Sequence, residues 1–267
     1  MGEGRMGEGR MGEGSKAAPV SGEAPTFVPH RCLGCGTELE RCPDRMQCPS
    51  CGAAWPLVDG VASYASAKYF GEIGEDEMGR LLAAARAGHW QEAARSWFES
   101  ADPEMYQYVI DLNRAAWIPL LPLGPESTVL DVGCGLGAVT HALALAYRRV
   151  VAVEPIAVRL HFTQVRCEQE GLTNVEVIQA TVGALPLFDG TFDLIVLNGI
   201  LEWVGQWRSE GSPRAAQLDT LRALRRRLRP GGLAVIGIEN RIGLSSFFNR
   251  VDHSGLRYTS LMPRAAA

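Results

Sequence analysis

The sequence lacks any uninterrupted apolar run that approaches the length of a membrane-spanning helix, and no apolar segment follows its first basic residues. These absences predict a protein with neither a membrane span nor a secretory signal. An excess of basic residues is also absent, since the formal net charge is −4, which gives no general attraction to nucleic acid. We therefore expect a cytoplasmic protein that has no membrane partner and for which nucleic acid is disfavoured.

The 267 residues are 46% apolar and 21% charged, which is ordinary for a globular chain of one large or two smaller domains. Residues 1–15 repeat MGEGR with minor variation, and they are glycine-rich without apolar anchors. Such a segment cannot offset the entropy lost on ordering. We expect residues 1–29 to form a disordered glycine-rich tail.

Seven cysteines are present, and five of them lie within residues 32–51, a spacing that favours a metal site over a disulfide framework. Two CxxC pairs are separated by twelve residues, and two such turns supply the four thiolates of a closed tetrahedral zinc site. The spare Cys42 and the flanking His30 are not expected to be ligands. A metal-free ribbon and a redox CxxC are the alternatives. The predicted ligands of this structural zinc are Cys32, Cys35, Cys48 and Cys51.

Residues 30–64 are predicted to form the zinc ribbon, which is closed by a short strand and an Asp-Gly turn at Asp59. Residues 65–120 are predicted to be a helical connector, a possible lid, with helices over 78–88, 91–98 and 104–117. We expect the apolar stripe of the third helix to be core packing rather than a substrate surface. The stripe consists of Met105, Tyr108, Val109, Leu112, Ala116 and Trp117.

From residue 121 to residue 267, strand patterns alternate with helix patterns, which predicts an α/β fold with a Rossmann-like, doubly wound parallel sheet. The expected strands are 129–132, 150–153, 175–178, 192–197 and 233–238. The expected helices are 138–147, 157–170 and 217–228.

A glycine-rich turn, Gly133 to Gly137, follows the first of these strands and opens the first of these helices. This corner predicts a nucleoside cofactor, because glycines allow close backbone approach and a helix N-terminus presents free N–H groups. The next strand ends at Glu154, 23 residues past Asp131, where an acid can accept hydrogen bonds from a ribose. With Ala138 the turn also satisfies G-x-G-x-x-G/A, so a nicotinamide or flavin dinucleotide remains a competitor.

Three motifs in order, within residues 127–240, resemble those of the class I S-adenosylmethionine-dependent methyltransferases, in a bacterial type 11/12-like form. They are D-x-G-x-G-x-G from Asp131, Leu185-Pro186 with the strand 192–198, and Leu228-Arg229-Pro230-Gly231-Gly232-Leu233. The CxxCG…CxxCGxxWPLVDGV run resembles the zinc ribbon that precedes the catalytic domain of various bacterial methyltransferases. The resemblance implies S-adenosyl-L-methionine as the cofactor.

The resemblance also implies roles for particular residues. Gly133, Gly135 and Gly137 would pass beside the methionine and ribose parts of the cofactor. Asp131 would set the turn and reach the cofactor amino group through water, and Glu154 would hold the ribose hydroxyls.

Two further positions concern the adenine and the methyl group. Thr181 stands where many members of the family have an Asp that contacts the adenine amino group, and a hydroxyl can still accept one hydrogen bond. Asn198 ends the fourth strand and would face the reacting methyl.

The segments 197–204, 238–243 and 252–264 resemble a group of bacterial methyltransferases associated with small-molecule or surface-glycan biosynthesis. An N-P-P-[YF] motif is absent from the stretch at Asn198, which disfavours base and amide N-methylation. A base is required where the acceptor must lose a proton. The candidates are His253, Glu202, Asp252 and Glu239.

The basic cluster on and just after the last predicted helix is expected to form a solvated face, with RNA or an acidic substrate as the alternative. The cluster consists of Arg222, Arg225, Arg226, Arg227 and Arg229. The family's last two strands have no clear counterpart after Asn240, so we expect a truncated member with an open sheet edge, covered by a protein partner or a dimer. The predicted function is methyl transfer to a small molecule or glycan. The alternatives are an impaired remnant that acts as a binding module, an RNA methyltransferase and an NAD-dependent oxidoreductase.

Overall fold

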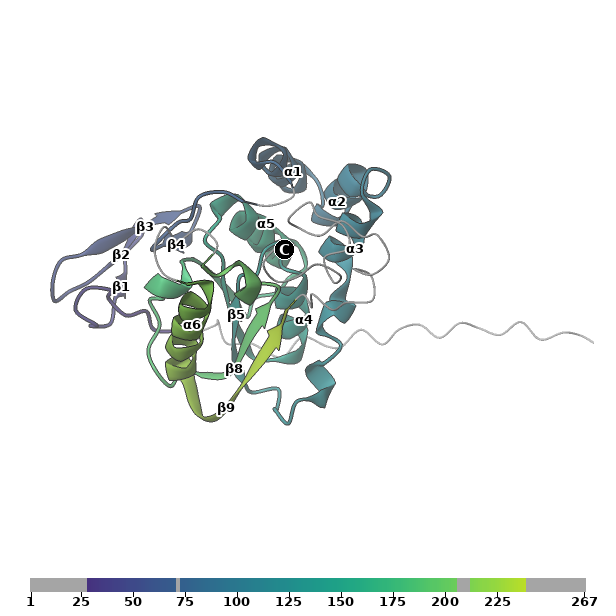
Figure 1. Ribbon diagram of the computed structural model, residues 1–267. Helices are drawn as coiled ribbons and strands as arrows, with labels where there is room; N and C mark the ends of the chain where they lie inside the picture. The colour runs from purple at the N-terminus through teal and green to yellow at the C-terminus, as the bar shows by residue number, and fades with distance from the viewer. Residues whose placement is uncertain (1–27, 71–72, 206–211, 239–267) are drawn as a thin grey trace, which may run out of the picture.

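A computed structural model describes residues 28–70, 73–205 and 212–238, which form a nine-stranded sheet with helices packed against it (Figure 1). The strand order is β1-β2-β3-β4-β7-β6-β5-β8-β9. From β4 to β9 every neighbouring pair is parallel, which confirms the predicted Rossmann-like fold. The α/β strands are β5 (Thr128–Val132), β6 (Arg149–Val153), β7 (Val175–Gln179), β8 (Phe192–Asn198) and β9 (Leu228–Gly237).

The helices of this part are α4 (Ala138–Ala146), α5 (Ala157–Gln169) and α6 (Pro213–Arg227). The first two match the predicted ranges within one residue. The third begins four residues before the predicted start, because the Ser212 side chain caps it by accepting from the Ala215 N–H and Pro213 suits its first turn. Strand β9 also begins earlier than predicted, at Leu228 rather than at residue 233. It includes the Arg-Pro-Gly-Gly turn, where its pairing with β8 is irregular.

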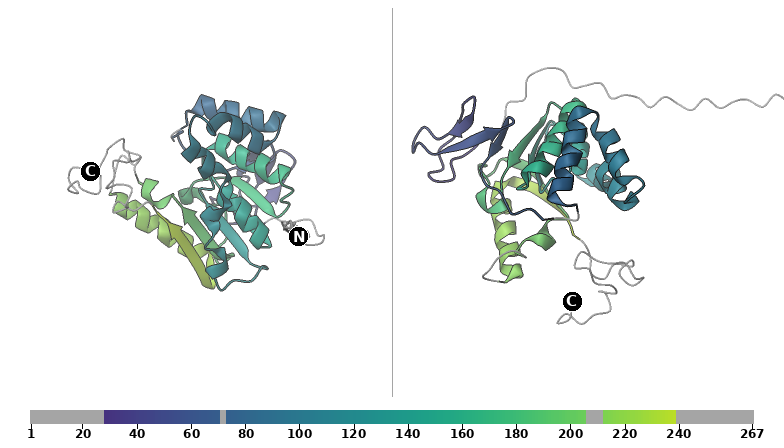
Figure 2. Two further views of the ribbon diagram at one scale, coloured as in Figure 1. Left: turned by 90° about the vertical axis from the view of Figure 1, so that its right-hand side faces the viewer. Right: turned by 90° about the horizontal axis from the view of Figure 1, so that it is seen from above.

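Alternate residues of β5 point to opposite faces of the sheet and pack against helices on both faces. Val129 belongs to a core that contains Leu143 of α4, whereas Leu130 belongs to a core that contains Leu224 of α6. The residue period of two in the strand is therefore what places α4 and α6 on opposite faces. Figure 2 shows α6 apart from the other helices.

The connector folds into α1 (Glu75–Ala87), α2 (Trp90–Phe98) and α3 (Pro103–Ile110), followed by the short 3₁₀ helices η1 (Leu112–Ala115) and η2 (Ile118–Leu120). The break between α1 and α2 falls at Gly88-His89, as predicted, and Asp102 caps α3. The prediction that the third helix runs to Trp117 is wrong. Asp111 takes an extended conformation and caps η1 instead, so the chain turns there.

The cysteine-containing segment forms the antiparallel strands β1 (Glu40–Arg41), β2 (Arg45–Gln47), β3 (Ala54–Val58) and β4 (Val61–Ser63). The predicted Asp-Gly turn joins β3 to β4, with both Asp59 and Gly60 at positive φ. Strand β4 then pairs in parallel with β7, in register Ala62 with Ile178. The ribbon therefore extends the sheet of the α/β part, and Figure 2 shows it projecting from one end.

Within the described ranges, no helix has the length and apolar character needed to cross a membrane. Three predictions concern residues that lie largely outside these ranges. They are the disordered tail, the missing last two strands and the open sheet edge beyond β9.

Candidate functional site

The turn between β5 and α4 is built around three glycines whose φ angles are positive, at +71° for Gly133, +55° for Gly135 and +79° for Gly137. A Cβ on Gly133 would lie 2.2 Å from Cδ1 of Ile200, and one on Gly137 would lie 2.8 Å from Cγ2 of Thr163. A Cβ on Gly135 would meet no protein atom within 4 Å. Gly137 is therefore restricted by the Thr163 side chain, which donates to the Gly135 carbonyl. Gly133 is restricted by a movable Ile200 side chain, whereas Gly135 faces open space that a ligand can occupy.

Glu154 follows β6 and ties this turn to the next strand. Its carboxylate accepts hydrogen bonds from the N–H of Gly135 (3.2 Å) and of Ile156 (3.1 Å), and its side chain is buried. Burial raises the pKa of Glu154, although Arg159 and the two N–H donors oppose the shift. The acid thus lies beside the glycine turn, at the carboxyl end of the strand adjacent to β5.

Asp131 lies in β5, one residue before the end of the strand, and is only 2% exposed. The Thr140 hydroxyl donates to its carboxylate at 2.6 Å. Burial raises the pKa of Asp131 to about 6, while that hydrogen bond and Arg114 act in the opposite direction. The protein therefore holds an acid in a place where ionisation is unfavourable, which is typical of functional sites.

This buried acid predicts a pH-dependent stability. The unfolded chain releases the proton near the ordinary value of 3.8 and the folded chain only near 6, so the free energy of unfolding falls as pH rises through this window. The loss is about 3 kcal/mol. Asp131→Asn, which can still accept from Thr140, should remove it and be more stable than wild type at pH 7 by up to that amount. Urea denaturation at pH 4 and 7 measures this. A difference between variant and wild type that does not change with pH would contradict the prediction.

A pocket opens at the carboxyl ends of β5 and β8, where ligands bind in open α/β sheets. Asn198, the last residue of β8, is paired with Gly237 on β9, and a Cβ on that glycine would lie 2.5 Å from the Asn198 Oδ1. The pocket is lined by Tyr108, Arg114, Asp131, Gly133, Cys134, Val139 and Asn198. Three of the predicted cofactor residues are thus brought together in one cavity.

Tyr108 and Arg114 enter this pocket from the connector, which sequence analysis did not predict. The prediction that Tyr108 belongs to the core is wrong, because 45% of its surface is exposed. The guanidinium of Arg114 lies 3.7 Å from the Tyr108 ring centre and donates to the Tyr108 carbonyl oxygen at 3.3 Å. The turn at Asp111 folds Arg114 back over the last turn of α3, and an Asp two residues before Asn113 was the local signal for that turn.

The other predicted site residues lie outside this pocket. Thr181 precedes the 3₁₀ helix η3 (Val182–Ala184) at the end of β7, two strands away from β5. Glu202 lies in η4 (Leu201–Trp203), just after β8, and is half-buried. Glu239, Asp252 and His253 lie outside the described residues, so their catalytic roles stay predictions.

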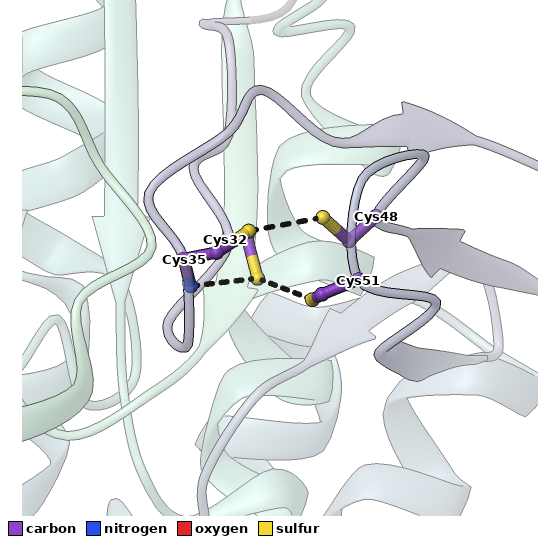
Figure 3. A group of neighbouring side chains, drawn as sticks. All are labelled: Cys32, Cys35, Cys48 and Cys51. Carbon is purple, nitrogen blue, oxygen red and sulfur yellow. Dashed lines mark hydrogen bonds between the residues drawn. The ribbon is translucent and has the colours of Figure 1, made fainter.

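The two CxxC pairs come together in the ribbon, with all four sulfur atoms within 4.8 Å of one another (Figure 3). The Sγ atoms of Cys32 and Cys51 are 3.6 Å apart, and those of Cys35 and Cys48 are 3.4 Å apart. Zinc–sulfur bonds of about 2.3 Å in a tetrahedron place sulfurs about 3.8 Å apart, so the arrangement fits this ion. Cys42 lies apart from the group and approaches Gln47.

The ribbon is fastened to the α/β part by buried polar contacts as well as by β4. His30 lies between the Tyr64 hydroxyl, 2.6 Å from Nδ1, and the Glu176 carboxylate of β7, 3.0 Å from Nε2. Burial and the Glu176 charge raise the pKa of Tyr64. The Arg31 N–H also donates to the carbonyl of Pro186, in the predicted Leu-Pro motif. One apolar core runs through both parts.

The basic helix departs from the predicted solvated face at one position. Arg227 is buried and pairs with Asp189, whereas Arg225 and Arg226 are exposed as expected. Arg229 pairs with Asp193 at 2.8 Å, and Arg222 pairs with Asp219 at 3.0 Å.

Comparison with known proteins places this site in context. Residues 130–236 match a family model described as a methyltransferase domain. The chain is 25% identical to a ubiquinone biosynthesis O-methyltransferase of Methylobacterium sp. (strain 4-46), over 62% of this chain and 73% of that protein. It is 31% identical to a tRNA U34 carboxymethyltransferase of Desulfotalea psychrophila, over 43% of this chain and 33% of that protein. The crystal structure of a SAM-dependent methyltransferase from Aquifex aeolicus is similar over 55% of this chain and 71% of the Aquifex chain, at 23% identity and a TM-score of 0.42.

Proposed function

We propose that the chain is a class I S-adenosylmethionine-dependent methyltransferase, through its methyltransferase domain at residues 130–236, and that it methylates a small molecule or a glycan. The chain spans 73% of the length of the ubiquinone biosynthesis O-methyltransferase and 33% of that of the tRNA carboxymethyltransferase, and these two relatives are named for different acceptors. The domain match therefore supports methyl transfer from S-adenosylmethionine, while the acceptor class rests on the features of this chain.

The observation that carries the proposal is the pair of opposite charges in the pocket at the end of β5. The methionine part of S-adenosylmethionine carries a carboxylate and an ammonium group. Arg114 would hold the carboxylate and Asp131 the ammonium, since both line the same pocket. Glu154, beside Gly135, would hold the ribose hydroxyls, and Thr181 lies near the end of β7 for the adenine. Thus the described residues supply a partner for each part of the cofactor.

When bound, the cofactor supplies an electrophilic methyl group on a sulfonium. The chain must then place the acceptor in line and remove its proton where needed. Asn198 at the pocket is suited to orient the acceptor. Glu202, Asp252 and His253 remain the proposed sources of a base.

Two observations support a small acceptor over RNA. The net charge is −4, and three of the five clustered arginines are paired with acids of the same region, which reduces their attraction for phosphates. An RNA surface on α6 would rest on Arg225 and Arg226.

We also propose that the cysteine group holds a structural zinc, because four thiolates close the coordination shell.

Equilibrium titration with S-adenosylhomocysteine tests the cofactor assignment, and we expect binding that NADH does not displace. Arg114→Met should weaken this binding about 10-fold through loss of one charge-assisted contact, with the affinity for methylthioadenosine unchanged because it lacks the amino-acid part. Arg222→Met, which alters an exposed ion pair on α6, is the control. Failure of folded wild type to bind S-adenosylhomocysteine would refute the proposal.

A further inference from the structure

Arg166 is a buried cation of α5 that lies outside the pocket, and its side chain is 0% exposed. In the described part of the chain no carboxylate lies within ion-pair distance of it. Its Nη1 donates to two backbone carbonyls, at 2.7 Å to Val109 and at 3.2 Å to Leu136. An arginine buried without a paired acid is unfavourable, so its presence calls for a role that an apolar residue cannot fill.

The two carbonyls belong to two segments that contribute other residues to the pocket lining. Val109 is in the last turn of α3, directly after Tyr108, and Leu136 is in the glycine turn between Gly135 and Gly137. The carbonyls at a helix C-terminus have no partner within the helix. Here the carbonyl of Tyr108 accepts from Arg114 and that of Val109 accepts from Arg166. Arg114 therefore lines the pocket, and Arg166 binds the same last turn of α3 without lining the pocket.

The remaining contacts hold the Arg166 guanidinium in place. Its Cζ lies 4.0 Å from the ring centre of Trp90, and Nε lies 3.4 Å from Nδ1 of His141. The indole N–H of Trp90 donates to the carboxylate of Glu170, which fixes the Trp90 ring. Contacts from α2 and α4 therefore restrict the guanidinium to the orientation in which Nη1 reaches both carbonyls.

We propose that Arg166 is a positioning residue that joins α3 to the glycine turn. Through these two carbonyls it holds Tyr108 and Arg114 over the pocket and so sets the affinity for the amino-acid part of the cofactor. This inference rests on the proposed function. Arg166 touches neither cofactor nor acceptor and acts through Arg114.

A double-mutant cycle between Arg166 and Arg114, measured by titration with S-adenosylhomocysteine, tests the proposal. Arg166→Met should raise the dissociation constant about 10-fold, as Arg114→Met does, and the double variant should be little weaker than either single variant. Arg166→Lys, which keeps a cation but has no planar fork to span two carbonyls, should give an intermediate effect and replaces the methionine variant if that variant does not fold. Arg148→Met, at an exposed ion pair with Glu126, should bind like wild type.

Methylthioadenosine distinguishes positioning from general damage, because it lacks the amino-acid part that Arg114 would hold. Its affinity should be the same in wild type and in the Arg166 variants. Multiplicative effects in the cycle, or an equal loss for both ligands, would overturn the inference while leaving the proposed function intact. If wild type binds neither ligand, the proposed function itself fails and this inference falls with it.

Discussion

Gly135→Ala is expected to abolish measurable binding of S-adenosylhomocysteine, with a loss of about 100-fold or more, while lowering the free energy of unfolding by only about 1 kcal/mol. The stability cost is small because the added Cβ meets no protein atom within 4 Å and only the backbone strain at φ +55° remains. The affinity loss is large because the open space at Gly135 is the space that the proposed cofactor fills. Isothermal titration and urea denaturation of the same preparations measure the two quantities.

Gly171→Ala is a matched control for this substitution. Gly171 has φ +67°, and its Cβ would also meet nothing within 4 Å, but it lies at the end of α5, away from the pocket. The two variants should lose similar stability, and only Gly135→Ala should lose affinity. Gly137→Ala should instead destabilise the fold, since its Cβ would lie 2.8 Å from Thr163. Retained binding in Gly135→Ala would show that the ligand does not occupy this space.

Cys51→Ser is expected to abolish binding of the proposed zinc and unfold the ribbon, the second large effect predicted for this chain. Structural zinc contributes about 10–16 kcal/mol in small zinc-binding peptides, and a segment as short as the ribbon buries too little surface to replace that contribution. Cys51 is exposed, so the substitution leaves no cavity and the effect comes from the lost ligand. Wild type should contain one zinc per chain and the variant nearly none, as measured by atomic absorption.

Amide hydrogen exchange locates the consequence of zinc loss. The Tyr64 N–H, which donates to the Gln179 carbonyl, should lose protection in Cys51→Ser, because β4 depends on the ribbon to stay paired with β7. The amides of β5 and β8, at the centre of the sheet, should keep theirs. Cys42→Ser makes the same chemical change outside the cysteine group and should keep zinc and protection alike. A metal-free wild type, or a Cys51→Ser variant with full zinc, would refute the assignment.

Local pattern was sufficient for the elements of the α/β part. The strand at Val129–Val132 and the helix from Ala138 were predicted within a residue or two, because residue periods of two and 3.6 are properties of short segments. The glycine turn and the two CxxC pairs were likewise predictable, since their chemistry depends on spacing of a few residues. The errors at Asp111 and at the start of α6 come from capping residues that end or begin helices against the apolar pattern.

The sequence by itself thus determined the strands and helices of the α/β part, the glycine turn after β5 and the spacing of the two CxxC pairs, each encoded within a short stretch. Only the tertiary structure decided which distant segments meet them. It paired β4 with β7, placed Tyr108 and Arg114 at the pocket, and buried Arg166 between α3 and the glycine turn. Such contacts depend on which free carbonyls, N–H groups and apolar faces find one another across the folded chain, and no periodicity records that choice.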